Sequence, residues 1–313
     1  MSLLATLFAA FGGGVFGAVI GGTTAFIFTG FLGLTGIAIM LGGGSDIVLN
    51  EVAFGPFFGP HVAFVGAVAA AAFAGRKSKN NPKKRTRQAT AKSEIASTAE
   101  TDATDVQEVF HADGEAIKGE DVTMPLFKTK DPSVLLVGGV FGILGYLLND
   151  LFASTWALPL DTIALVVLIF GFITRLVFGQ SGLTGIFPQG EKRFNFTGKE
   201  ILFHGIWGAG IAAVVAYVSI LLDVNNLGFA ISAASLIFLY FGLQFPASHH
   251  ITMVAGYAAL AFNSVWIAAL FGLVVVIAGE YTQRAFNTHV DTHIDMPAIN
   301  IAFFSFLILG ILS

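Results

Sequence analysis

Two short stretches of the chain place histidine directly after a break in apolar sequence. Ionisable groups at membrane depth are rare and usually functional. Helix N-termini bind anions, and histidine can gain a proton near physiological pH. We therefore expect these breaks to bind a solute or carry a proton, although the histidines could instead hydrogen-bond backbone groups freed by the break. The residues concerned are Gly59, Pro60 and His61 at the first break, and Gln244, Ser248, His249 and His250 at the second.

The two histidine stretches also resemble each other. Residues 61–73 read HVAFVGAVAAAAF and residues 250–262 read HITMVAGYAALAF, with six identical positions. Glu51 precedes the first break, and a carboxylate near a paired histidine could carry a proton or bind a cation. The likeness predicts an internal repeat with one break in each copy.

A second candidate site is the stretch NTHVDTHIDMP near the end of the chain. It alternates His289, Asp291, His293 and Asp295, which would point the same way in an extended segment. Imidazole with carboxylate suits a divalent transition metal. A hydrated loop is the competing interpretation. Apart from the divalent metal of this hypothesis, we expect no cofactor.

The composition is that of an integral membrane protein. Hydrophobic residues make up 55% of the chain and charged residues 12%, against about 25% charged in soluble domains. There is no cysteine, which excludes disulfides, thiolate metal sites and cysteine nucleophiles. Glycine-rich nucleotide loops and the common hydrolase motifs are also absent from the sequence.

Apolar runs of about 20 residues, the length that spans a bilayer, predict an all-α polytopic protein of about ten transmembrane helices. Residues 61–75 are too short to span, at about 22 Å, so residues 52–75 form one broken span. The expected parts are residues 1–75 (spans 1–3), 76–131 (linker), 132–200 (spans 4 and 5 with a cytoplasmic loop) and 201–313 (spans 6–10).

The linker, residues 76–131, carries eleven of the 16 Lys and Arg residues. Its polar composition predicts disorder. Beside a membrane helix, a basic run sets orientation and touches anionic lipid heads, so we expect it in the cytoplasm and expect no nucleic-acid partner. Lys192, Arg193 and Lys199 place the later loop on the same side.

With the linker inside, spans 1–3 run opposite to spans 6–8. This predicts a 5+5 inverted repeat with broken helices at spans 3 and 8, the segments that mark the substrate site in transporters of this plan. A re-entrant segment at 244–262 is the alternative. Glycine- and alanine-rich helix faces could also join copies of the chain into a homo-oligomer.

The stretch FGPFFGPHVAFVGAVAAAAFAG resembles a segment of uncharacterised bacterial polytopic membrane proteins labelled permease-like. That resemblance covers about 22 residues and implies no substrate or mechanism. We expect a secondary transporter of the bacterial inner membrane that carries a small anionic solute with a coupled proton or cation. The alternatives are an ion channel and a membrane-embedded, metal-dependent enzyme.

Overall fold

The computed structural model describes residues 2–80 and 117–313, and these residues form helices without any strand. In this described part of the chain, five helices are long and apolar enough to cross a membrane. They are α1 (Leu3–Ile20), α2 (Gly22–Leu41), α5 (Pro132–Asp150, continued to Thr155), α7 (Gly198–Leu222) and α10 (Val265–Phe286). The chain is thus a multi-pass membrane protein.

Shorter apolar helices fill the spaces between the long ones. They are α3 (Val65–Lys79), α6 (Thr162–Phe178), α8 (Leu227–Ser235), α9 (His249–Phe262) and α11 (Met296–Ser305). A π-helical turn, Pro60–Phe64, leads into α3, and irregular residues 242–248 lead into α9. The helical segment that contains α3 therefore starts at Pro60, and α9 follows an irregular stretch.

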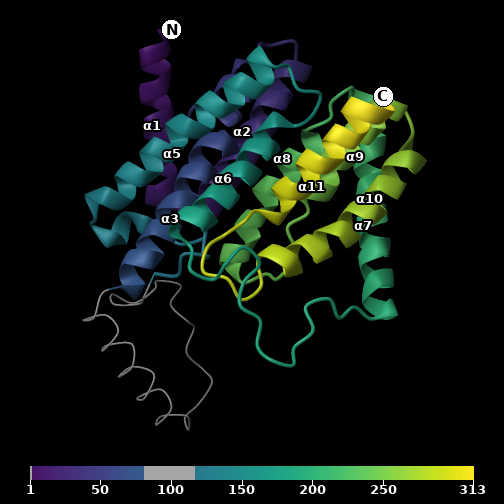
Figure 1. Ribbon diagram of the computed structural model, residues 1–313. Coiled ribbons are helices and arrows are strands. Elements are labelled where there is room, and N and C mark those ends of the chain that lie inside the picture. Colours follow the sequence, from purple (N-terminus) through teal and green to yellow (C-terminus); the bar gives the residue numbers. More distant parts are fainter. Residues whose placement is uncertain (1, 81–116) are drawn as a thin grey trace.

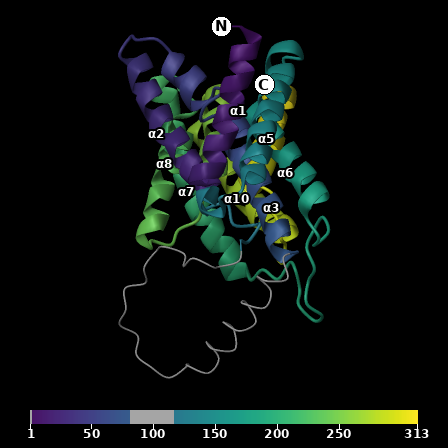
Figure 2. The same ribbon diagram turned by 90° about the vertical axis from the view of Figure 1, so that its left-hand side faces the viewer.

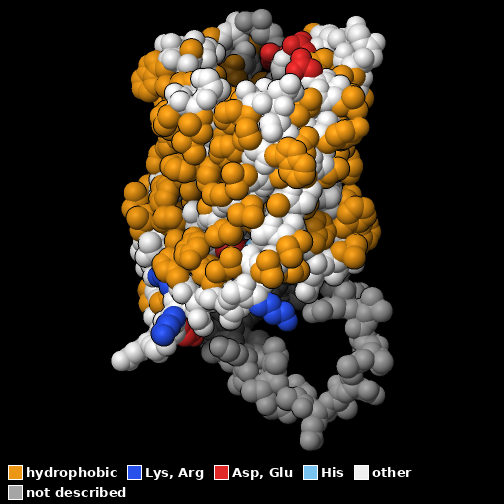
Figure 3. Space-filling view, turned by 90° about the vertical axis from the view of Figure 1, so that its right-hand side faces the viewer, with side chains coloured by type: hydrophobic (Ala, Val, Ile, Leu, Met, Phe, Trp, Pro, Cys, Tyr) orange, Lys and Arg blue, Asp and Glu red, His pale blue; other side chains and the backbone are white. Residues whose placement is uncertain are grey.

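The helices form one bundle in which both chain ends lie at the same end of the molecule (Figure 1). The end of α3, which precedes residues 81–116, lies at the opposite end, which we call the linker end (Figure 2). Hydrophobic side chains cover the middle of the surface, and Lys and Arg gather toward the linker end of the face in Figure 3. This distribution is typical of a membrane belt with a basic cytoplasmic side.

Glycines allow the first helices to approach closely. A Cβ added at Gly14 of α1 would overlap the carbonyl oxygen of Gly138 in α5, and one at Gly17 would overlap that of Ala63. Close backbone approach through small residues is the usual way that membrane helices pack. These glycines thus allow close packing between helices of the same chain. The homo-oligomer expected from such helix faces stays a prediction.

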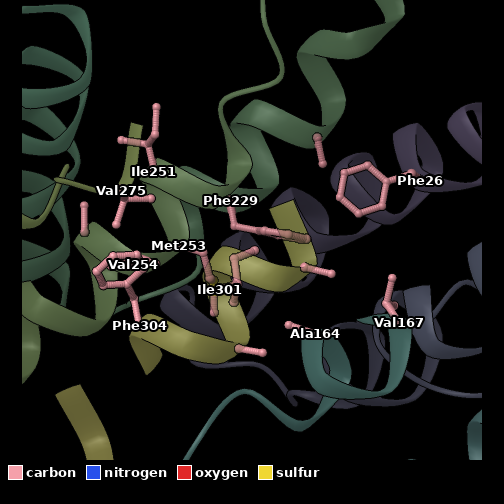
Figure 4. Packing of buried hydrophobic residues seen from close by; sticks show 14 of the residues in the cluster. Phe26, Ala164, Val167, Phe229, Ile251, Met253, Val254, Val275, Ile301 and Phe304 are labelled. Atoms are coloured by element: carbon pink, nitrogen blue, oxygen red, sulfur yellow. The ribbon is translucent and has the colours of Figure 1, made fainter. Parts of the chain in front are cut away.

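The central core joins helices from the whole chain. Phe26 of α2 contacts Phe229 of α8 edge to face, with ring centroids 5.5 Å apart. Figure 4 shows further buried side chains from α6, α9, α10 and α11 around this pair, including Val167, Met253 and Ile301. The core therefore packs α9 against helices from both the beginning and the end of the chain.

Part of the segment expected to be a disordered linker, residues 76–131, is folded onto the bundle. Residues 76–79 are the last turn of α3. Residues 117–131 pack on the bundle through Ile117, Met124 and Leu126, which are buried against Ala18 and Ala70. A few apolar residues within the polar stretch explain this packing, because the average composition of the whole segment does not reveal them. The rest of the expected linker, residues 81–116, lies outside the described residues.

Candidate functional site

A cavity of about 700 Å³ lies inside the bundle, within the usual size of a small-molecule site. Toward the linker end it reaches Thr123, which lies beside the α1–α2 turn, and Gln283 of α10. Toward the opposite end it reaches Asn50 and Asn225. The cavity thus extends along the bundle between these two groups of residues.

His249 and His250 occupy the first turn of α9 and line this cavity. The His249 ring lies against Phe26, with centroids 4.7 Å apart. His250 faces α10, since a Cβ added at Gly279 would lie 2.9 Å from its Nε2. Both side chains are buried, and neither Nδ1 has a hydrogen-bond partner among the described residues. Buried polar atoms are normally paired, so these two nitrogens are hydrogen-bonding capacity that the described residues leave unused.

Ser248 stands at the N-cap position of α9, but its side chain does not cap the helix. Its hydroxyl instead pairs with the hydroxyl of Ser232, 2.7 Å away. Gln244 is exposed and lies outside the cavity lining. The first turn of α9 therefore keeps backbone N–H groups without a side-chain cap.

The first break contributes Pro60 to the cavity, but not His61. The His61 ring is buried and lies parallel to that of Tyr146 in α5, with centroids 6.4 Å apart. Gly59 is buried beside this ring. Glu51 is exposed and does not line the cavity. The structure thus brings Pro60, His249 and His250 to one cavity and leaves His61 and Glu51 outside its lining.

Two aspartates, each directly before a short helix, face the same cavity. Asp161 precedes α6 and its Oδ1 accepts a hydrogen bond from Ala164 N–H at 2.8 Å. Asp295 precedes α11 and its Oδ2 accepts from Ala298 N–H, also at 2.8 Å. Both are N-caps, which explains why the two short helices start there.

Each aspartate has a further partner. The hydroxyl of Tyr257, in α9, donates to Asp161 Oδ2 at 2.9 Å, and His293 Nε2 lies 3.4 Å from Asp295 Oδ1. Asp161 is not among the residues expected from the sequence. The shared pattern Asp-x-x-Ala before an apolar run was the signal that could have identified it.

The four residues of the alternating stretch do not converge. His289 lies 3.4 Å from Glu191, whereas Asp291 accepts hydrogen bonds from Ser181 and His293 faces Asp295. Within residues 2–80 and 117–313, no three His, Asp or Glu side chains are grouped closely enough to hold a metal ion. The chain turns between these residues, so the extended geometry that the alternation required is absent.

Asp291 has a structural role at the linker end. Burial raises the pKa of its carboxyl, but hydrogen bonds from Ser181, Gln180 and Lys79 outweigh that effect and leave the pKa below its usual range. These bonds join the loop after α10 to the loop after α6 and to the end of α3. Asp291 thus fastens three segments together at this surface.

The charged residues of the cavity lining are all acidic. They are Asp161, Glu280 and Asp295, and no Lys or Arg occurs among the described residues that line the cavity. Arg175 is buried nearby but donates to the Thr292 hydroxyl and backbone rather than to the cavity. The chemistry on offer is therefore carboxylate, imidazole and aromatic contact.

A family model described as a family of unknown function (DUF7973) matches residues 1–119, 95–197 and 199–313. No curated protein matches the chain. No solved structure matches it either. The matched segments together extend over nearly the whole sequence.

Proposed function

The chain belongs to this family of unknown function, and we propose that it is a secondary transporter, or permease, for a small solute. The observation that carries the proposal is a cavity of about 700 Å³ lined from both halves of the sequence, by Pro60 at one helix interruption and by His249 and His250 at the other. Transporter sites are commonly built where interrupted helices meet in the middle of the membrane.

The proposal includes the ten-span, 5+5 inverted plan. It is supported by the directions of the short helices, since α3 ends at the linker end while α9 runs toward the opposite end (Figure 1). It is also supported by the matching caps of α6 and α11, made by Asp161 and Asp295. Under this plan each half supplies one interrupted helix and one capped half-length helix to the cavity.

We place the protein in the bacterial inner membrane with the linker end in the cytoplasm. The basic residues at that end, among them Arg76, Lys77 and Arg193, favour this orientation because cytoplasmic loops carry an excess of Lys and Arg. Lipid, the solute and a coupling ion are the proposed partners.

The test asks whether the cavity opens alternately to both sides. Met253 lies in α9 and lines the cavity, and the chain has no cysteine. We expect a Met253→Cys variant in sealed vesicles to react with a membrane-impermeant thiol reagent added to either side, while planar bilayers show no single-channel current. The wild-type protein, treated with the same reagent, is the control for background.

Reaction from one side only, in every condition, would exclude a transport pathway and favour a receptor or enzyme cavity. Reaction from both sides together with discrete currents would favour a channel. Each outcome can be measured while the solute is still unidentified.

A further inference from the structure

The cavity also indicates what kind of solute it holds. We propose that the ligand is an amphiphilic organic cation, whose positive charge is balanced by Asp161 and Asp295 and whose apolar body lies against the aromatic wall. This inference rests on the proposed transport function, because it treats the same cavity as the solute site.

The first argument is the charge balance of the lining. In the described part of the chain, five helical segments begin at or beside residues that line the cavity, namely α6, α8, α9, α11 and the turn at Pro60 that leads into α3. Each helix start is equivalent to about half a positive charge. Three carboxylates face the same space, so the helix starts offset most, but not all, of their charge. Glu280 has a partial partner in His204, whose Nδ1 lies 3.7 Å away. The remaining field favours a cation.

The second argument concerns the helix starts themselves. An anion would be expected at a free helix N-terminus. The first turns of α6 and α11 already donate to Asp161 and Asp295. The starts of α8, of α9 and of the turn at Pro60 have no side-chain cap. The sequence-based expectation of an anionic solute relied on the starts at Pro60 and His249, but an anion bound there would share the cavity with three carboxylates.

The third argument is the remaining hydrogen-bonding capacity. An ionised carboxylate can accept about four hydrogen bonds. Each oxygen of Asp161 has one protein partner, Ala164 N–H or the Tyr257 hydroxyl. Asp295 is similarly placed between Ala298 N–H and His293. Both carboxylates can therefore still accept an N–H or contact a quaternary centre.

The fourth argument is the wall between the two aspartates. Cations bind favourably over aromatic faces, and quaternary ammonium groups are recognised in this way. Asp161 contacts Tyr257 of α9, and Asp295 lies near His249 of the same helix. Tyr257 and His249 are eight residues apart, which corresponds to about 12 Å along the helix. A bulky ligand can touch aromatic surface along this length. The aromatic lining residues are Phe26, Phe54, Phe64, Trp207, Phe229 and Tyr257.

The unpartnered nitrogens point to a ligand independently of charge. His249 and His250 are at least nine-tenths buried, line the cavity and leave Nδ1 without a partner among the described residues. A neutral imidazole has one acceptor nitrogen, which suits an ammonium N–H. Leaving such atoms unpaired in a buried site is unfavourable, so a donor that reaches them stabilises the site.

The experiment uses two probes of closely similar shape and opposite charge. Binding of radiolabelled tetraphenylphosphonium and tetraphenylborate is measured on the full-length protein in nanodiscs, with empty nanodiscs subtracted. We expect saturable binding of the phosphonium and at least tenfold weaker binding of the borate. Equal or tighter binding of the borate would overturn the inference, and so would absence of saturable phosphonium binding. This comparison needs no variant.

Variants then assign the site. Asp161→Asn and Asp295→Asn remove the charge but keep a side chain that caps helices equally well. Each should weaken phosphonium binding at least tenfold. Glu51→Gln removes an exposed carboxylate outside the cavity, and His61→Gln changes a histidine outside its lining; both should bind as the wild type does. Wild-type affinity in both aspartate variants would overturn the assignment.

Failure of this inference can be told apart from failure of the transport proposal. Two-sided reactivity of Met253→Cys without phosphonium binding would reject the substrate class and retain the transporter. Phosphonium binding with one-sided reactivity would retain the cation site and reject transport.

Discussion

At the scale of single residues, the most informative side chains are those that perform two tasks. Asp161 and Asp295 each start a helix and each present a carboxylate to the cavity. The capping bond fixes the side chain, because the backbone N–H it accepts belongs to a rigid first turn. A charge held in this way is positioned before any ligand arrives, which lowers the cost of ordering the site on binding.

A third aspartate caps a helix outside the membrane. Asp131 precedes α5, accepts from the Ser133 N–H at 3.0 Å and pairs with Lys77 at 2.5 Å. The hydrogen bond from Lys77, followed by that from Ser133, lowers the pKa of the Asp131 carboxyl. A depressed pKa in the folded state adds stability above the unfolded pKa, about 3.9, and this contribution is lost as the pH falls through the folded value.

We therefore expect the thermal midpoint of the wild-type protein to fall more steeply between about pH 5 and pH 3 than that of Asp131→Asn, which keeps the cap. Lys77→Gln should likewise make the thermal midpoint fall less steeply over this pH range. Lys128→Gln, an exposed change on the preceding turn, is the matched control and should follow the wild type. Identical slopes for wild type and Asp131→Asn would show that this pair does not contribute.

At the scale of elements, the glycines decide how closely helices pass. Gly145 of α5 lies against the π-helical turn before α3, and a Cβ added there would overlap the His61 carbonyl oxygen. The neighbour is backbone, so it cannot rotate away as a side chain would. His61 is therefore better understood as part of a tight helix contact than as part of the cavity wall.

We predict that Gly145→Ala destabilises the protein by about 1–3 kcal/mol, the usual cost of overpacking. The measurement is the thermal midpoint of detergent-purified protein. Gly12→Ala in α1 is the control, because a Cβ there meets nothing within 4 Å. Alanine is favoured over glycine in helices by about 1 kcal/mol, so the control should be unchanged or more stable. Equal midpoints for the two variants would contradict the packing argument.

At the scale of the whole molecule, the apolar belt and the basic end define how the bundle sits in a membrane. The loop after α6 and the end of α3 lie at the linker end, and Ser45 follows α2 at the opposite end (Figures 1 and 2). The orientation of all helices follows once one end is assigned.

Labelling of introduced cysteines tests that assignment. Gln189 and Ser45 are both exposed, and the chain has no cysteine of its own. An impermeant thiol reagent should label Ser45→Cys in intact cells and Gln189→Cys only after the cells are opened, because the basic end belongs in the cytoplasm. Labelling of both positions from outside would show that Ser45 and Gln189 do not lie on opposite sides of the membrane. Labelling of Gln189→Cys alone from outside would refute the proposed orientation.

The sequence by itself determined that this is a helical membrane protein, because apolar runs of spanning length and scarce charge leave no other class. It also predicted breaks at Pro60 and at the stretch Gln244–Ser248, because these residues interrupt the apolar pattern locally, and the broken spans stay a prediction. The basic residues beside these helices likewise predicted which end carries positive charge.

Only the tertiary structure decided which polar groups share the cavity. His61 and His250 occupy matching sequence positions, yet the first packs against Tyr146 and the second lines the cavity. Periodicity predicts which face of a helix a residue occupies, but not which other helix that face contacts. The sequence alone therefore could not distinguish the environments of the two histidines. In the same way, Asp161 meets Tyr257 across 96 residues, and the polar stretch before α5 docks through Leu126. Contacts between distant segments are set by how the helices pack against one another, which no local pattern records.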